Sequence, residues 1–185
     1  MIIKTISRYD GRLLHQRFAY RYFGDNVNAL GDIIAFRASM HVEAEFMIDQ
    51  EDVLNNDFIY SDDAVNFLWE IPQLPPFGAV AFQRLFNHEI AIILGKMLAK
   101  PIEVRGDDIY IINGGKASVS ITHVKDGTAL GHTGINIMAG DKAPKFAYST
   151  KLTDEQAEKF MEEVIALFYT MTQDMFIATT KVLSK

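Results

Sequence analysis

The sequence predicts an α+β fold in which an antiparallel or mixed β-sheet is backed by helices. Three observations support this: strand-like segments follow one another between residues 102 and 137, a long apolar segment covers Ala79 to Leu98, and Thr153 opens a second long helical segment. Strands and helices thus occur in blocks, an order that does not favour a doubly wound parallel sheet. The 185 residues fit one sizeable core, so we expect a single domain over residues 1–185.

Five elements are expected in the first part of the chain. The alternation of Ile2 to Ile6 and the β-rich run Asp32 to Arg37 predict strands. Between them, apolar residues on one face predict a helix over Leu14 to Phe23. Glu43 to Ile48 could form a strand or a short helix. Ser61 to Leu68 predict a further helix, because the Ser61 hydroxyl could cap it and two carboxylates would follow in its first turn.

In the second part of the chain the spacing of apolar residues is more regular. Ala79 to Leu98 has apolar residues at offsets of three and four, which predicts a largely buried helix. The period then changes to two and predicts consecutive antiparallel strands at Ile102–Val104, Ile109–Ile111, Ala117–Ile121 and Gly134–Ile137. Thr153 and Gln156 form a capping-box pattern for the last helix. Its stripe of Phe and Met residues is expected to be core or the face of a homodimer.

Composition excludes several classes of function. The formal net charge of −6 argues against non-specific nucleic-acid binding, so we expect no nucleic-acid partner. The chain has no cysteine, which excludes disulfides and thiolate chemistry. No apolar run approaches the ~20 residues of a membrane span, and the N-terminus does not have the pattern of a signal peptide. By elimination we expect a cytoplasmic protein that does not bind membranes.

The hairpin around Gly114, Gly115 and Lys116 is the most informative segment for function. The glycines permit positive φ and a close backbone approach, and a single lysine follows them. Its ammonium could reach a phosphate or carboxylate and stabilise negative charge on a phosphoryl or acyl oxygen. Asp107 and Asp108 on the preceding turn could hold a metal–nucleotide complex or orient a hydroxyl. The alternative is an ordinary solvent-exposed hairpin, since a lysine after a glycine turn is common.

This segment resembles the biotin and lipoate protein ligases. Those enzymes place a helix before a strand that ends in a basic residue, then an acidic turn, a hairpin with glycine and the catalytic lysine, and a strand ending in Gly-Ile-Asn. Here the same succession runs from Ala79–Leu98 through Arg105-Gly106-Asp107-Asp108 and Gly115-Lys116 to Gly134-Ile135-Asn136. The resemblance implies that Lys116 contacts the acyl carbonyl and α-phosphate of an adenylate. It also implies that Asp108 lies near the nucleotide and Asn136 on the strand that lines the pocket.

A second resemblance covers most of the chain. It is to a small prokaryotic family, domain of unknown function family 366, which we associate with the same ligase and class II aminoacyl-tRNA synthetase fold. The segments that carry it are Tyr9-Asp10-Gly11, Phe36-Arg37, Met47-Ile48-Asp49, Glu51-Asp52-Val53, Ser61-Asp62-Asp63, Trp69-Glu70 and Lys116 to Ile121. This resemblance implies the fold and brings no activity with it.

One departure from the ligases bears on the cofactor. The ligases carry a Gly/Arg-rich adenylate loop in the N-terminal half, whereas the corresponding segment here, residues 36–41, has Arg37 and no glycine. The pyrophosphate of ATP would therefore lack a backbone cradle. The use of ATP and Mg²⁺ is thus in doubt, and the binding of a smaller anionic or acyl ligand is less affected.

The remaining acidic run is Asp49, Glu51 and Asp52. These carboxylates could hold Mg²⁺, but acidic runs are usually solvated surface, and we favour that interpretation. No metal site is predicted elsewhere, because the two histidines that flank the Asp126-Gly127 turn lack a third ligand.

Two functional hypotheses follow from the sequence. The first is a ligase-type site for an anionic small molecule or acyl-adenylate, with Lys116 as the catalytic residue and with a ligand-binding set formed by Arg37, Asp108, Gly115 and Asn136. The second is a non-catalytic ligand-binding or homo-oligomeric assembly module on the same fold. The missing glycine loop favours the second hypothesis, and the succession of hairpin motifs favours the first.

Overall fold

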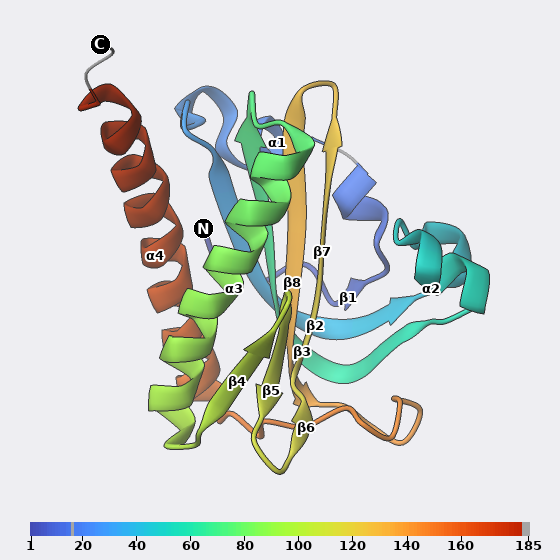
Figure 1. Cartoon of the computed structure of the whole chain (residues 1–185). Coiled ribbons are helices and arrows are strands. Elements are labelled where there is room, and N and C mark those ends of the chain that lie inside the picture. The colour runs from blue at the N-terminus through green and yellow to red at the C-terminus, as the bar shows by residue number, and fades with distance from the viewer. Residues whose placement is uncertain (16, 183–185) are drawn as a thin grey trace.

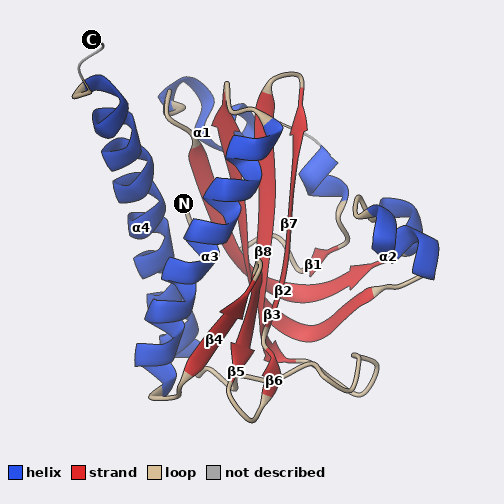
Figure 2. Ribbon diagram, viewed as in Figure 1, coloured by secondary structure: helices blue, strands red, loops and turns tan. Residues whose placement is uncertain are grey.

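A five-stranded mixed sheet with two long helices on one face forms the centre of the molecule (Figures 1 and 2). The computed structural model describes residues 1–15 and 17–182. The sheet has the order β1-β2-β3-β8-β7, formed by β1 (Arg8–Tyr9), β2 (Asp32–Val42), β3 (Ile59–Pro72), β8 (Thr128–Met138) and β7 (Ser118–Lys125). Only β1 and β2 pair in parallel. The predicted α+β fold with a mixed sheet backed by helices is confirmed.

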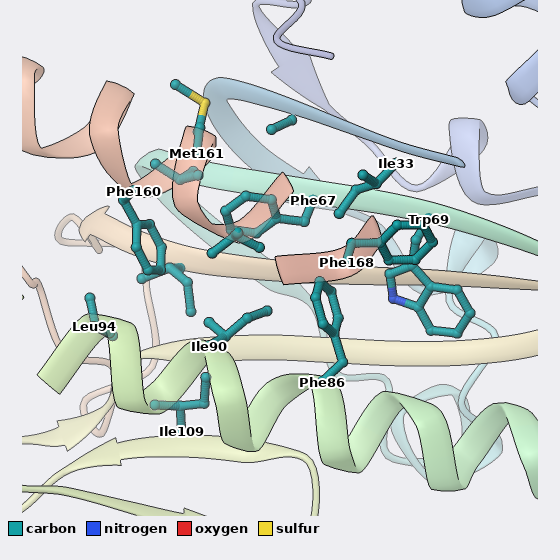
Figure 3. Close-up of a cluster of buried hydrophobic side chains, with 14 of the residues drawn as sticks. Ile33, Phe67, Trp69, Phe86, Ile90, Leu94, Ile109, Phe160, Met161 and Phe168 are labelled. Atoms are coloured by element: carbon teal, nitrogen blue, oxygen red, sulfur yellow. The ribbon is translucent and has the colours of Figure 1, made fainter. Parts of the chain in front are cut away.

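The helices α3 (Pro76–Leu98) and α4 (Asp154–Thr180) cover one face of this sheet. Each helix begins at a residue that favours a helix start. Pro76 occupies the first turn of α3, and Thr153 and Gln156 form the predicted capping box of α4. Figure 3 shows how Phe86 and Ile90 from α3 meet Phe160 and Phe168 from α4 over the strand residue Phe67. The apolar stripe of the last helix therefore belongs mainly to the core, although Phe176 and Ile177 remain exposed.

The opposite face of the sheet carries a second apolar cluster and shorter elements. Phe18, Phe36 and Met40 are fully buried in this cluster. Residues from η1 (Arg12–His15), α1 (Ala19–Phe23) and η3 (Ala44–Phe46) pack against it. The short elements η2 (Gly24–Asn26) and α2 (Gln50–Asn55) follow α1 and η3 along the chain. In Figure 1 the segment with α2 projects from the sheet at the right, well away from α3 and α4.

A small second sheet carries the hairpin singled out above. It consists of β4 (Ile102–Arg105), β5 (Asp108–Ile111) and β6 (Gly115–Lys116), paired in antiparallel order. The predicted run of consecutive antiparallel strands is confirmed, but the chain changes sheets between Lys116 and Ser118. Lys116 thus lies at the junction of the two sheets.

The segment Ser61 to Leu68 forms part of strand β3 and not the predicted helix, which is the largest correction to the sequence-based expectations. β3 lies between β2 and β8, and residues 64–71 are buried on both faces. A strand covered on both faces lacks the alternation of apolar and polar residues by which strands are recognised. The Ser61 hydroxyl, expected to cap a helix, donates to the carbonyls of Asp63 and Met138.

Three N-terminal expectations also change. In the predicted strand Ile2 to Ile6, only Ile2 forms a β-bridge, and the regular strand begins at Arg8. The predicted helix Leu14 to Phe23 is divided into η1 and α1, and position 16 between them lies outside the described residues. The segment Glu43 to Ile48, left open between strand and helix, contains the 3-10 helix η3. These segments take their geometry from contacts with the sheet, which a local pattern does not contain.

Candidate functional site: a cavity on the sheet face opposite the long helices

A cavity of about 450 Å³ lies on the sheet face that α3 and α4 leave free. Its size is within the range of small-molecule sites, roughly 300–1,000 Å³. Apolar residues from the sheet and the N-terminal segment line one part: Tyr9, Leu14, Met40, Phe46, Val119 and Ile121. Polar residues from α2 and its N-cap, the β4–β5 turn, strands β5 and β6, and β8 also line it: Asp49, Asp52, Asp107, Asp108, Lys116 and Asn136.

Lys116 borders the cavity, and both its side chain and its backbone are bonded to neighbouring residues. Its ammonium Nζ lies 2.8 Å from Asp108 Oδ1 on the neighbouring strand β5. Its backbone N–H donates to the Phe146 carbonyl, and its own carbonyl accepts from Tyr148 N–H. The lysine therefore has a fixed backbone, and its side chain, 22% exposed, extends along the cavity wall.

Gly114 and Gly115 have a different role from the one expected. A Cβ at Gly115 would lie 2.5 Å from the Phe146 carbonyl oxygen, and a Cβ at Gly114 would lie 2.7 Å from the Tyr148 ring. The close approach that these glycines allow is therefore to the chain segment 144–148. The amides of Gly114 and Lys116 donate to the carbonyls of Ile111 and Phe146. They do not form a free cradle for a phosphate, and Gly115 does not line the cavity.

The turn acid Asp107 is anchored to helix α3 by a buried polar network. Gln83 Nε2 donates to Asp107 Oδ2 at 3.0 Å, and Asn87 Nδ2 donates to the Asp107 carbonyl at 2.7 Å. Both amides also donate to Ser120 Oγ, and Asn87 Oδ1 accepts from Thr133 Oγ1. Burial, followed by the nearby charge of Asp108, raises the pKa of Asp107. This network fixes the hairpin that carries Asp108 and Lys116.

Asn136 presents an unpaired amide to the cavity. Its neighbours Ile135 and Ile137 point into the helix-side core, so the alternation of a strand directs Asn136 to the cavity face. The backbone of Asn136 bonds to Ala117 and Thr150. The residue as a whole is only 5% exposed, and among the described residues its amide has no hydrogen-bond partner. Its amide atoms are not among the fully buried unpaired atoms of the described residues, so they are accessible from the cavity, where a bound group would pair with them.

His132 forms part of the cavity floor as a neutral ring. The Tyr9 ring stacks on it at a centroid distance of 4.0 Å, and Nε2 lies 2.9 Å from Asn66 Oδ1. Because Asn66 Nδ2 donates to the Ala64 carbonyl, Asn66 Oδ1 is the acceptor and His132 Nε2 the donor. Burial lowers the pKa of His132 to about 3, so the imidazole is neutral near pH 7.

The acidic wall of the cavity was not expected from the sequence. Asp49 and Glu51 are exposed, in agreement with the expected solvated surface, whereas Asp52 on α2 is only partly exposed. Asp49, Asp52 and Asp57 nevertheless line the cavity. Burial, followed by the charges of Asp49 and Asp57, raises the pKa of Asp52. Only the position of α2 relative to the sheet could reveal this wall. The single sequence signal was the acidic run itself.

Arg37 does not belong to this group, contrary to the expectation from the sequence. Its side chain forms ion pairs of 2.6 Å with Asp63 and with Asp154 at the start of α4, and hydrogen bonds to both carboxylates raise the pKa of the guanidinium. Ile33 and Ala35 on the same strand point into the helix-side core, and Arg37 shares their parity. It therefore lies on the face of the sheet away from the cavity.

The fold with its open sheet face is that of the biotin and lipoate protein ligases. LipL1 of P. falciparum, in complex with lipoate, matches with a TM-score of 0.56 at 14% identity; the match covers 100% of this chain and 63% of LipL1. A mutant biotin protein ligase from Aquifex aeolicus, in complex with biotin, matches with a TM-score of 0.56 at 11% identity, over 89% of this chain and 68% of that one. A bipartite lipoate protein ligase from Thermoplasma acidophilum matches with a TM-score of 0.56 at 12% identity, over 94% of this chain and 82% of that one. At these identities the likeness shows the fold alone.

The chain belongs to the family described as Domain of unknown function (DUF366), which matches residues 1–183. A protein of unknown function from Pyrococcus horikoshi has a TM-score of 0.88 at 27% identity, over 100% of this chain and 97% of that one. No curated protein matches the chain in sequence. Within the described residues, no helix is both long and apolar enough to span a membrane.

Proposed function

We propose that the cavity binds a small molecule through an acyl or carboxylate oxygen held by Lys116, with Asn136 as a second polar contact. The observation that carries this proposal is the position of Lys116. It is the one positively charged side chain among the described residues that line the cavity, and Asp108 holds its ammonium at the wall. The apolar floor around Tyr9 and Met40 would accommodate the body of the ligand.

The chemistry available at this point is stabilisation of negative charge. An ammonium beside an acyl oxygen favours any step in which charge develops on that oxygen, because the surroundings are partly shielded from water. Asp108 would position the ammonium in the free protein and compete with the ligand for it. Among the described residues, Lys116 is accordingly the candidate catalytic residue if an acyl group is activated here.

A triphosphate fits the site less well than an acyl group. The amides of Gly114 and Lys116 are already bonded within the protein, and Arg37 pairs with acids on the other face. Four further acids, besides the partner of Lys116, would repel phosphates. These observations favour ligand binding over ATP-dependent ligation, so our proposal includes no step that uses ATP or Mg²⁺.

The non-catalytic assembly module remains the second candidate. The exposed Phe176 and Ile177 near the end of α4 favour it, because they could extend an apolar contact to a second copy. The homodimer stays a prediction, and the cavity proposal does not depend on it.

A thermal-shift screen with a matched variant tests the proposal. Octanoate, lipoate, biotin, 2-aminooctanoate and AMP would be added to the wild type and to Lys116→Ala. A ligand at about 100 times its dissociation constant should raise the free energy of unfolding by roughly 2.7 kcal/mol. We expect at least one acid to stabilise the wild type and not the variant. Stabilisation that Lys116→Ala retains, or no stabilisation by any of these compounds, would contradict the proposal.

A further inference from the structure

The cavity carries more negative charge than its single cation can balance. Lys116 is paired with Asp108, and four other carboxylates line the same space: Asp49, Asp52, Asp57 and Asp107. Within the described residues, none of these four forms an ion pair with a basic side chain. Like charges that share a partly buried space destabilise one another unless a cation lies between them.

Asp52 is a half-buried carboxylate of this group, and the charge of Lys116 acts on it without forming an ion pair. Asp49 accepts from the Glu51 amide as the N-cap of α2, and Asp107 accepts from Gln83. Asp57 is exposed to water. The Asp52 side chain is half-buried on the cavity wall, and among the described residues it has neither a hydrogen bond nor an ion pair. Burial, followed by the charges of Asp49 and Asp57, raises the pKa of Asp52, whereas the charge of Lys116 acts in the opposite direction.

A second observation points to the same space independently of the acids. The unpaired, nearly buried amide of Asn136 lies on the cavity floor, directly bonded through its backbone to the residue that follows Lys116. An amide offers both donors and an acceptor, so it fits a ligand that is polar at the Lys116 end. The cavity thus has a polar end at Lys116 and Asn136 and an acidic wall at Asp52.

We infer that the ligand is an amino-acyl compound, with its acyl oxygen at Lys116 and Asn136 and a protonated amine at Asp52. The acyl half of this inference depends on the proposed function, and the amine half is new. A protonated amine would supply the missing positive charge and form a charge-assisted hydrogen bond with Asp52. A metal ion fits less well, since no three His, Asp or Glu side chains of the described chain are grouped closely enough to hold one.

Calorimetric titration with three matched acids tests the inference. Octanoate, 2-aminooctanoate and 8-aminooctanoate share one chain length, and at pH 7 both amines are protonated. We expect at least one of the amino acids to bind the wild type about tenfold or more tightly than octanoate, since one charge-assisted hydrogen bond is worth about that factor. In Asp52→Asn, which keeps the shape of the side chain, this ratio should fall to about one.

Two further variants separate the outcomes. Asp174→Asn removes one exposed charge from α4 on the other face and should keep the full preference for the amine. Lys116→Ala should weaken the binding of all three acids. Equal, Lys116-dependent binding of the three acids by the wild type would overturn the amine inference and leave the proposed function intact. Binding that Lys116→Ala retains, or no binding, would overturn both. Stabilisation by Mg²⁺ alone that Asp52→Asn abolishes, or an amine preference that Asp52→Asn keeps, would overturn the assignment of Asp52.

Discussion

Lys116 Nζ and Asp108 Oδ1 lie 2.8 Å apart across the neighbouring strands β6 and β5, at the edge of the cavity. The pair fixes the ammonium in the free protein, but it also keeps a carboxylate where the oxygen of an acidic ligand would bind. A ligand must therefore share the ammonium with Asp108 or displace it.

The Asp108→Asn variant tests this competition. We expect it to bind octanoate about three- to tenfold more tightly than the wild type, because the amide competes less strongly for Lys116 and a negative charge is removed. Calorimetric titration of the variant, with Asp174→Asn as a control for net charge, measures the effect. Unchanged or weaker binding in Asp108→Asn would show that Asp108 does not oppose the ligand.

Two buried asparagines should respond differently to truncation. Asn87 donates to Asp107 and Ser120 and accepts from Thr133, so Asn87→Ala leaves several buried groups unpaired. We expect a loss of about 2–4 kcal/mol in the free energy of unfolding. Asn136→Ala removes an amide without a partner, and we expect a change within about 1 kcal/mol but weaker ligand binding. Urea denaturation of both variants gives the comparison. A large loss in Asn136→Ala would mean that the amide serves the fold.

Gly115→Ala should destabilise the protein more than Gly127→Ala, although both glycines have a positive φ. Gly115 has a φ of +136°, and a Cβ there would meet the Phe146 carbonyl, whereas Gly127 has a φ of +75° with open space around it. We expect about 1 kcal/mol for Gly127→Ala, from the backbone conformation alone, and at least about 2 kcal/mol for Gly115→Ala. Urea denaturation measures both. Equal losses would contradict the close packing of residues 144–148 on the hairpin.

The neutral state of His132 predicts a pH dependence of stability. Unfolded, this histidine binds a proton below its ordinary pKa of ~6.5. Folded, it remains neutral down to a pKa of about 3. Between these values the unfolded chain binds more protons, so the free energy of unfolding falls as the pH is lowered, by roughly 1 kcal/mol per pH unit.

Urea denaturation at pH 7 and pH 5 isolates the contribution of His132. The difference between the two pH values should be smaller in His132→Gln than in the wild type, whereas His88→Gln, at an exposed position, should retain the difference. The same pH dependence in all three proteins would contradict a neutral buried His132.

The long-range parts of this structure were the least predictable from the sequence. The helices α3 and α4 carry their own apolar periodicity, α4 also carries a capping box, and glycine turns mark the hairpin, so these elements were correctly predicted. Strand β3 was mistaken for a helix because it is buried on both faces and shows no alternation. The face of the sheet on which Arg37 lies could have been deduced, because Arg37 is two and four residues from Ala35 and Ile33 on the same strand and therefore points to the same side. The position of Asp52 in the same cavity as Lys116 could not, because it depends on where α2 lies relative to the sheet.

A crystal structure with the tightest-binding acid from the titrations would test the central claim most directly. We expect the ligand in the cavity, with an acyl or carboxylate oxygen within hydrogen-bond distance of Lys116 Nζ and its apolar part on the floor near Tyr9 and Met40. A ligand bound elsewhere, for example at Arg37 on the helix side of the sheet, would contradict the account.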